Sequence, residues 1–162
     1  MTSGLTRRGP FLLTFALDQQ VHELLALTFE EAPLQPPEFA IYSVLLNTGD
    51  IMPSELADIL GMGRSTLSNR LRRMDSRGHL RRRRNPDDGR SQLVSLTAAG
   101  RRLTEQSMPA FARAIGTFRA FLDVDEGAML DAMEAMSRAV AAAIEQLEHD
   151  DAPPLAAVRQ PR

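Results

Sequence analysis

The chain has 162 residues, 43% of them hydrophobic and 25% charged, which is enough for one globular domain with a sizeable core. It contains no cysteine, so disulfides, thiolate chemistry and cysteine metal sites are excluded. No apolar run is long enough for a membrane span, and the N-terminus lacks the pattern of a signal peptide. We therefore expect a cytoplasmic protein with no membrane partner.

The net charge of −2 conceals an uneven distribution. Between Arg64 and Arg102 there are 12 arginines and three acidic residues, a net of +9, which leaves −11 for the rest of the chain. All 19 basic residues are arginine, which we interpret as genome composition. Arginine nevertheless offers a planar fork that suits phosphates and guanine edges. A basic middle segment in an acidic chain indicates a localised surface for a polyanion.

Four helices are predicted in the first half of the chain. Three of them begin with proline, which suits the first turn because its missing N–H would be unpaired there. A broad apolar face indicates that the first helix is substantially buried. Gly61 separates the third helix from the fourth, and two short helices joined in this way are the outline of a helix-turn-helix. The predicted ranges are 10–32, 36–48, 53–60 and 64–77.

A change of pattern after the fourth helix predicts a β-hairpin with strands 80–84 and 92–96. The turn between them, Asn85–Gly89, contains Pro and Asp-Gly, which are strong turn signals. Residues in the second strand alternate, with Val94 and Leu96 on one face. A further, very short strand is considered at Ile51 and Met52.

Two long helices are predicted after the hairpin. Thr97 caps the first of them, and Pro109 must kink or break it. The second opens at Asp123 or Asp125 and carries an apolar stripe that extends to Leu147. This stripe is too long to be buried on a small winged core, so mutual burial by two copies is predicted. The alternative is a helical pair within one chain.

The fourth helix is the candidate for reading a base sequence. Leu67, Leu71 and Met74 fall on one face, and the opposite face carries groups that hydrogen-bond base edges. The N-terminal part of such a helix enters the major groove. The base-reading candidates are Arg64, Ser65, Thr66, Ser68 and Asn69, and the phosphate candidates on this helix are Arg70, Arg72 and Arg73. The alternative is an arginine-rich face that only contacts solvent.

Four adjacent arginines, Arg81–Arg84, lie on the first predicted strand. Side chains of a strand point alternately to both sides, so these four cannot all form salt bridges within the chain. A basic hairpin beside a recognition helix suits phosphates and a minor groove, and the alternative is a basic loop without function. The wing candidates are Arg82, Arg83, Arg84, Asp88 and Arg90.

Several motifs between residues 55 and 100 occur in the order typical of a known family. They are Glu55-Leu56-Ala57, Gly61, Arg64–Ser68, Arg77-Gly78, Arg83–Ser91 and Val94–Gly100. In these motifs, and in element order from about residue 10 to 148, the chain resembles the MarR family of winged-helix regulators. The resemblance implies a mainly α fold with a small β-hairpin wing (α+β), a winged helix-turn-helix with flanking dimerisation helices.

The resemblance also implies a two-fold homodimer, in which the first, fifth and sixth helices pair and the recognition helices enter successive major grooves. Asp88 would brace the wing, and Arg90 at its tip would enter the minor groove. Two residues depart from the family's pattern. Gly63 stands where a Ser often caps the recognition helix, and His79 stands where the family usually has an apolar residue. Both departures weaken any inference about the operator but not the fold.

The predicted domain organisation follows from this dimer. A DNA-binding lobe is expected at 34–98, and a helical dimerisation region is expected from 10–33 together with 99–149. The ends, 1–9 and 150–162, are expected to be flexible or disordered.

Members of this family often respond to small aromatic or amphipathic molecules, and some to oxidants or metals. Oxidant sensing through cysteine is excluded, and the three histidines lie far apart in the sequence, so we expect no metal site and no cofactor. An organic effector would bind between the dimer helices and the DNA-binding lobe. The candidates to line this pocket are Phe15, Gln19, His22, Phe39, Tyr42 and Phe111. The alternative is that the three phenylalanines belong to the core.

The sequence therefore predicts a transcriptional regulator, a ligand-responsive repressor that binds double-stranded DNA at a near-palindromic operator as a homodimer. The alternative is an architectural DNA-binding protein without ligand sensing. We expect no enzyme, because no Gly-rich nucleotide loop follows a strand and no nucleophile or paired carboxylates are suitably arranged. A winged-helix module for protein interaction would carry neutral or acidic residues in place of these arginines.

Overall fold

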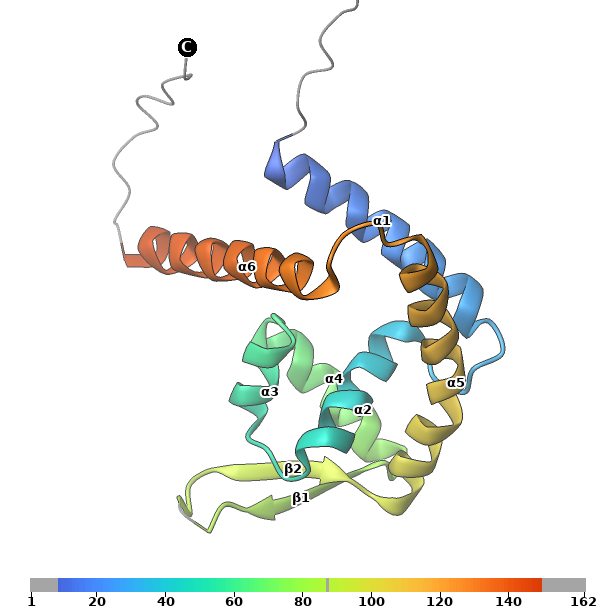
Figure 1. The fold of residues 1–162 in the computed structure, drawn as a ribbon. Helices are drawn as coiled ribbons and strands as arrows, with labels where there is room; N and C mark the ends of the chain where they lie inside the picture. The colour runs from blue at the N-terminus through green and yellow to red at the C-terminus, as the bar shows by residue number, and fades with distance from the viewer. Residues whose placement is uncertain (1–8, 87, 150–162) are drawn as a thin grey trace, which may run out of the picture. The chain divides into compact units, whose positions relative to one another are not determined.

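In the residues that the computed structural model describes, 9–86 and 88–149, the chain forms six helices and a two-stranded hairpin (Figure 1). The elements are α1 (Pro10–Phe29), α2 (Pro36–Thr48), α3 (Pro53–Ile59), α4 (Arg64–Ser76), β1 (Leu80–Arg84), β2 (Gln92–Leu96), α5 (Ala98–Phe121) and α6 (Glu126–His149). The predicted mainly α fold with a hairpin wing is confirmed. The predicted flexible ends lie outside the described residues, apart from Gly9.

The chain divides into two compact units, one that extends to Thr117 and one that starts at Phe118. The first unit contains α1 to α4, the hairpin and most of α5. The second contains the last residues of α5 and α6. The predicted division into a DNA-binding lobe at 34–98 and a dimerisation region around it stays a prediction.

Two glycines produce the sharp changes of direction around α4. Gly61, between α3 and α4, has a φ of 58°, and Gly78, between α4 and β1, has a φ of 71°. Both values lie in the left-handed region, which residues with a Cβ rarely adopt. The N–H of Gly78 donates to the carbonyl of Asp75, and the N–H of His79 donates to that of Met74, so the end of α4 is closed by backbone hydrogen bonds.

The core of the first unit lies between α2, α3, α4 and the hairpin. Its completely buried side chains include Tyr42, Leu45, Leu56 and Val94. The two strands are antiparallel, in a register that pairs Leu80 with Leu96 and Arg84 with Gln92. Ile51 forms a single bridge with Val94, which is all that remains of the predicted short strand. The hairpin is thereby attached to the segment that precedes α3.

The burial of β2 departs from the predicted alternation. Val94 and Leu96 share a buried face, but Ser95 between them is also only 2% exposed. Among the described residues, no hydrogen-bond partner is found for the Ser95 hydroxyl. Strict alternation fails where β2 is surrounded: β1 and Ile51 pair with its two edges, and α2 and α3 pack against it.

The start of α5 is joined to the end of the hairpin by close backbone contacts. The Thr97 hydroxyl donates to the carbonyl of Gly78 at 2.8 Å, and the Thr97 N–H donates to that of His79 at 3.0 Å. Thr97 Oγ1 also accepts the N–H of Gly100 at 3.2 Å, which is the predicted cap. A Cβ at Gly100 would lie 2.5 Å from the carbonyl oxygen of His79, so only glycine allows this approach.

α5 runs through Pro109 as one continuous helix, so the predicted break does not occur. Proline removes a single backbone N–H, and the remaining hydrogen bonds of a 24-residue helix maintain it. Two side chains of α5 also hold the end of α1. The Ser107 hydroxyl accepts the N–H of Leu34 at 3.3 Å, and Arg113 donates to the carbonyl of Thr28 at 2.6 Å.

The prediction that α1 is substantially buried is wrong for the single chain. Only Thr28 and Phe29, at its C-terminal end, are buried, whereas Phe11 is 76% and Phe15 is 65% exposed. The apolar pattern reports that a surface is apolar, but it does not identify what covers that surface. The described residues of the first unit leave the N-terminal half of α1 exposed.

α6 begins as predicted, with Asp125 as its cap: the N–H of Ala128 donates to Asp125 Oδ1 at 2.8 Å. Arg119 forms a two-pronged ion pair with Glu126 across the turn that precedes the helix. α6 has no buried residue, although its stripe of large apolar side chains includes Met133 and Ile144, each about half exposed. None of the helices in the described part of the chain is long and apolar enough to cross a membrane.

Candidate nucleic-acid interface

α4 is held in the first unit by one face and presents the other to solvent. Leu67, Leu71 and Met74 are at most 3% exposed and fix the helix against the core. The opposite face carries most of the predicted DNA contacts. Arg64, Ser65, Thr66, Ser68, Asn69, Arg72 and Arg73 are exposed, and Arg70 is half-buried. The structure thus brings the base-reading candidates together on one accessible surface.

The start of α4 has no side-chain cap. Gly63 occupies the capping position, and no side chain accepts a hydrogen bond from the first turn. This agrees with the departure noted in the sequence, where a Ser would have provided that acceptor. Backbone N–H groups at such a helix start are suited to an anionic oxygen.

The arginines of β1 alternate between two faces of the hairpin, and most of them are paired. Arg83 Nε lies 2.9 Å from Asp50, and Arg81 lies 4.0 Å from the same carboxylate. On the other face, Arg82 Nε donates to Asp75 Oδ2 at 3.0 Å. Only Arg84, of the four, forms no ion pair with a described residue. More of these arginines are paired than the alternation suggested, because acidic residues flank both faces of the strand.

These ion pairs leave the hairpin strongly positive. Three of the four arginines of β1 share two carboxylates, those of Asp50 and Asp75, and each pair is partly exposed to solvent. Exposed pairs of this kind stabilise a fold by about 1 kcal/mol or less, since water screens them. A phosphate can therefore compete for these guanidinium groups.

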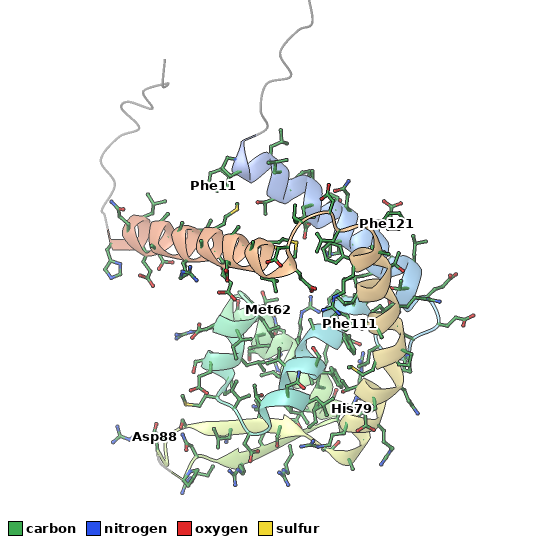
Figure 2. All side chains as sticks on the ribbon, in the orientation of Figure 1. Phe11, Met62, His79, Asp88, Phe111 and Phe121 are labelled. Atoms are coloured by element: carbon green, nitrogen blue, oxygen red, sulfur yellow. The ribbon has the colours of Figure 1, made fainter. Side chains whose placement is uncertain are left out.

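The tip of the hairpin is closed by hydrogen bonds around Asp88, which Figure 2 shows at the far end of the hairpin from His79. The N–H of Arg90 donates to Asp88 Oδ1, and the N–H of Ser91 donates to the carbonyl of Asp88, both at 3.0 Å. Asn85 Nδ2 donates to the Ser91 hydroxyl at 3.0 Å. Asp88 thus shapes the turn that carries Arg90, whose side chain is exposed.

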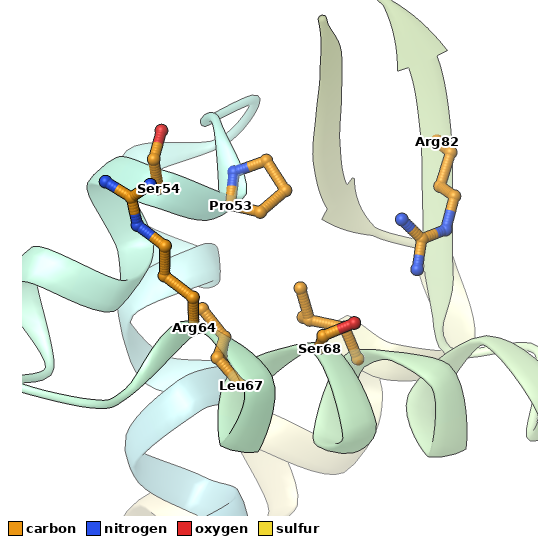
Figure 3. A pocket seen from close by; sticks show the side chains of 7 residues that line it. Pro53, Ser54, Arg64, Leu67, Ser68 and Arg82 are labelled. Atoms are coloured by element: carbon orange, nitrogen blue, oxygen red, sulfur yellow. The ribbon is translucent and has the colours of Figure 1, made fainter.

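A shallow groove of about 160 Å³ lies where α3, α4 and β1 meet (Figure 3). Its floor is apolar, formed by Pro53, Leu67 and Leu71. Its rim is polar: Arg64 and Arg82 stand on opposite sides, and Ser68 projects between them (Figure 3). Two guanidinium groups and a hydroxyl around one groove make a surface suited to a phosphate of a nucleic-acid backbone.

The effector-pocket candidates occupy different environments. Phe39 and Tyr42 are core residues of α2, at most 3% exposed, and the ring of Phe39 packs 5.3 Å from that of Phe111. Phe15, Gln19 and His22 lie on the exposed part of α1. The residues that would line a cleft at a dimer interface are thus divided between the core and an uncovered helix. This assignment stays a prediction.

A polar cluster that the sequence did not predict connects α2 with the end of α4. The Tyr42 hydroxyl lies 2.8 Å from His79 Nδ1, and Arg77 donates to Glu38 at 2.9 Å. Burial raises the pKa of the Tyr42 hydroxyl, and the charge of Glu38 raises it further. Burial also lowers the pKa of His79, an effect that Arg77 reinforces and Glu38 opposes. His79 therefore provides a hydrogen-bond partner for the buried Tyr42 hydroxyl, which an apolar residue at this position could not provide.

Sequence reasoning missed the acidic residues of this surface. Asp75 is the only acidic residue of α4, and Asp50 directly precedes the Ile51 bridge. The signal for Asp75 was its isolation in an otherwise basic helix. Asp50 could not have been found, since its proximity to β1 depends on a pairing between distant segments. Among the described residues, no group of three or more histidine or acidic side chains could hold a metal ion.

Comparison with known proteins identifies the fold and its relatives. A model of the MarR family matches residues 32–91, which span α2, α3, α4 and the hairpin up to its turn. The structure of the PcaV transcriptional regulator from Streptomyces coelicolor, in complex with its natural ligand, superimposes with a TM-score of 0.67. It is 26% identical and covers 88% of this chain and 99% of its own. Over residues 32–91, the chain is similar to the MarR family.

Two other matches illustrate the extent of the likeness. A variant of E. coli MarR complexed with operator DNA has a TM-score of 0.65 and 25% identity, and covers 77% of this chain and 90% of its own. An uncharacterized HTH-type transcriptional regulator of Bacillus subtilis, YdgJ, is 28% identical over 90 residues, 55% of this chain and of YdgJ. The chain thus spans about half the length of this curated relative.

Proposed function

We propose that the protein is a sequence-specific DNA-binding transcriptional regulator that acts as a homodimer. The observation that carries this proposal is the joint surface of α4 and the hairpin. On it, Arg64, Ser68 and Asn69 are exposed beside a strand of four arginines. Side chains able to read base edges and arginines able to meet phosphates lie next to each other, as a winged helix-turn-helix requires. The proposal assigns no enzymatic activity.

The exposed apolar surface supports a homodimer. In the first unit, Phe11 and Phe15 of α1 are largely exposed, and in the second unit the apolar stripe of α6 has no cover. Each unit therefore presents several large apolar side chains to solvent, as a surface that binds a partner does. A two-fold assembly would bury both and would present two α4 helices about one turn of DNA apart, roughly 34 Å.

The regulator is proposed to act as a repressor that a small aromatic or amphipathic effector releases from a near-palindromic operator. Support comes from relatives: PcaV was crystallised with its natural ligand, and E. coli MarR with operator DNA. An effector alters DNA affinity only if it prefers one spacing of the two recognition helices. The candidates to line its pocket are the six residues predicted from the sequence: Phe15, Gln19, His22, Phe39, Tyr42 and Phe111.

The test is fluorescence anisotropy with the full chain. The wild type first enriches a duplex from a randomised library, and this selected duplex is then compared with a shuffled version over a salt series. We expect tight binding of the selected duplex and much weaker binding of the shuffled one. Affinity should fall steeply with salt, because each phosphate contact contributes about 0.9 to the slope of log K against log salt.

Two outcomes would contradict the proposal. Equal, strongly salt-dependent binding of both duplexes would favour an architectural DNA-binding protein. No binding to either duplex at low salt would leave the arginine surface to a different partner.

A further inference from the structure

Asp75 stands apart from the other residues of α4, because it is the only acidic residue of that helix. It lies in the last turns of α4, where the helix dipole disfavours an acidic side chain. It faces no cation of its own helix in an ion pair among the described residues. Its partner is Arg82 of β1, seven residues further along the chain, whose Nε donates to Asp75 Oδ2 at 3.0 Å.

Arg82 lies on the face of β1 opposite to that of Arg81 and Arg83. It pairs with Val94 in the register and shares a strand face with Leu80, a core residue. Its side chain is 35% exposed, whereas those of Arg81 and Arg83 on the opposite face are 65% and 52% exposed. Arg82 is thus the arginine that lies between the hairpin and the recognition helix.

The contact with Asp75 orients Arg82 without occupying all of its donors. Asp75 accepts from Nε, and the guanidinium lies at the rim of the groove, opposite Arg64 with Ser68 between them (Figure 3). A guanidinium has five N–H donors, so the two terminal nitrogens remain able to meet a phosphate. Asp75 also places one negative charge beside the path of the DNA backbone.

We propose that Asp75 is a specificity-determining residue of this surface. It holds Arg82 in one orientation and lowers the local positive potential. The arginine then meets a phosphate well only where the DNA backbone follows the shape of the preferred site. A free Arg82 would follow any backbone and would strengthen binding to unrelated DNA. The inference rests on the proposed function.

The experiment compares Asp75→Ala with the wild type on the selected and the shuffled duplex. We expect the variant to bind shuffled DNA about three- to tenfold more tightly, which corresponds to the usual coupling of neighbouring charged groups. The selected duplex should gain less, so the ratio of the two affinities falls. The salt slope on shuffled DNA should steepen by about one, because one more arginine reaches a phosphate.

Asp58→Ala is the matched control. Asp58 is also exposed and near the C-terminal end of a short helix of the same unit, but it does not contact Arg82. Asp58→Ala removes the same charge as Asp75→Ala, so an effect that both variants share is due to net charge alone. Thermal unfolding of each variant checks that the fold is retained, as expected for exposed positions.

Arg82→Gln tests whether Asp75 acts through Arg82. In that background, Asp75→Ala should leave the affinity ratio unchanged. The inference is overturned if Asp75→Ala changes the affinity for both duplexes by the same factor as Asp58→Ala does. It is also overturned if Asp75→Ala lowers the affinity ratio as much in the Arg82→Gln background as in the wild type. If the wild type discriminates between the two duplexes and Asp75→Ala has the same affinity ratio, this inference is refuted and the proposed function stands. Equal binding of both duplexes by the wild type would overturn the proposed function and this inference with it.

Discussion

At the scale of single residues, the proposed function assigns some exposed side chains to the bases of DNA and others to its backbone. Asn69 projects from the exposed face of α4, where an amide can bond an adenine edge. Arg90 is exposed at the tip of the hairpin, where the hydrogen bonds of Asp88 shape the turn. These two positions should respond differently to substitution.

Arg90→Ala is expected to weaken binding to every DNA sequence, because it removes a cation from the wing without changing base contacts. Asn69→Ala should instead relax base preference at one position of each half-site, at a cost of about 1–3 kcal/mol for the preferred base. Anisotropy on the selected duplex, on single-base variants of it and on shuffled DNA distinguishes the two patterns. Wild-type behaviour of both variants on all duplexes would refute both assignments.

His79 predicts a pH dependence of folding. Its pKa is lowered in the folded protein from an ordinary value of 6.5, so the unfolded chain binds more protons between the two values. Stability is therefore present above about pH 6.5 and is lost as the pH falls through the folded pKa. Protonation would place a second cation beside Arg77 and disturb the contact with the Tyr42 hydroxyl.

The measurement is urea unfolding of the wild type and His79→Leu between pH 5 and 8. The variant should be less stable by about 1–3 kcal/mol near pH 8, since the buried Tyr42 hydroxyl loses its partner. This deficit should shrink as the pH falls, because only the wild type carries the titrating group. Parallel curves for the two proteins would show that His79 does not titrate with folding.

At the scale of elements, the junction between the hairpin and α5 depends on one close approach. The backbone of α5 at Gly100 meets the carbonyl of His79 so closely that a Cβ would lie 2.5 Å from its oxygen. Thr97 adds two hydrogen bonds across the same junction. α5 is thereby joined rigidly to the end of α4 through the Gly78 turn, so a movement of α5 would reach the recognition helix.

Gly100→Ala should destabilise the protein by roughly 1–3 kcal/mol, because backbone has to move to admit the methyl group. Gly116→Ala in the same helix is the control, since a Cβ there meets nothing within 4 Å and alanine favours a helix by up to about 1 kcal/mol. Thermal unfolding should therefore move in opposite directions for the two variants. Equal stability would mean that the junction adapts to the added methyl without strain.

At the scale of the whole molecule, the proposed function depends on an assembly that one chain does not complete. In the described part of the chain α6 has no buried residue, and a second copy would cover its apolar stripe. If two copies associate, two α4 helices act together on DNA. A variant that cannot dimerise should then lose tight DNA binding. Stability should then depend on protein concentration.

Ile144→Asp places a charge in the apolar stripe of α6, and Ala142→Asp places the same charge on the opposite side of the helix. We expect Ile144→Asp to yield a monomer in sedimentation experiments at micromolar concentration, because a buried unpaired charge costs several kcal/mol. Its affinity for the selected duplex should fall more than tenfold. Ala142→Asp should stay dimeric, and two dimeric variants would refute this interface.

The sequence by itself determined the helices, the hairpin and the basic surface of this protein. These features depend on local rules: prolines at helix starts, glycines in left-handed turns, and apolar residues at helical spacing. The exposed face of α4 was predictable for the same reason, since Leu67, Leu71 and Met74 determine which face is buried.

Only the tertiary structure decided which charges and polar groups meet. Asp50 reaches Arg83 because Ile51 bridges to β2, and Tyr42 meets His79 across 37 positions of sequence. Such contacts depend on how distant segments pack, which no local pattern records. The burial of α1 was mispredicted for a related reason: the sequence shows that a surface is apolar, whereas the structure shows whether the same chain covers it.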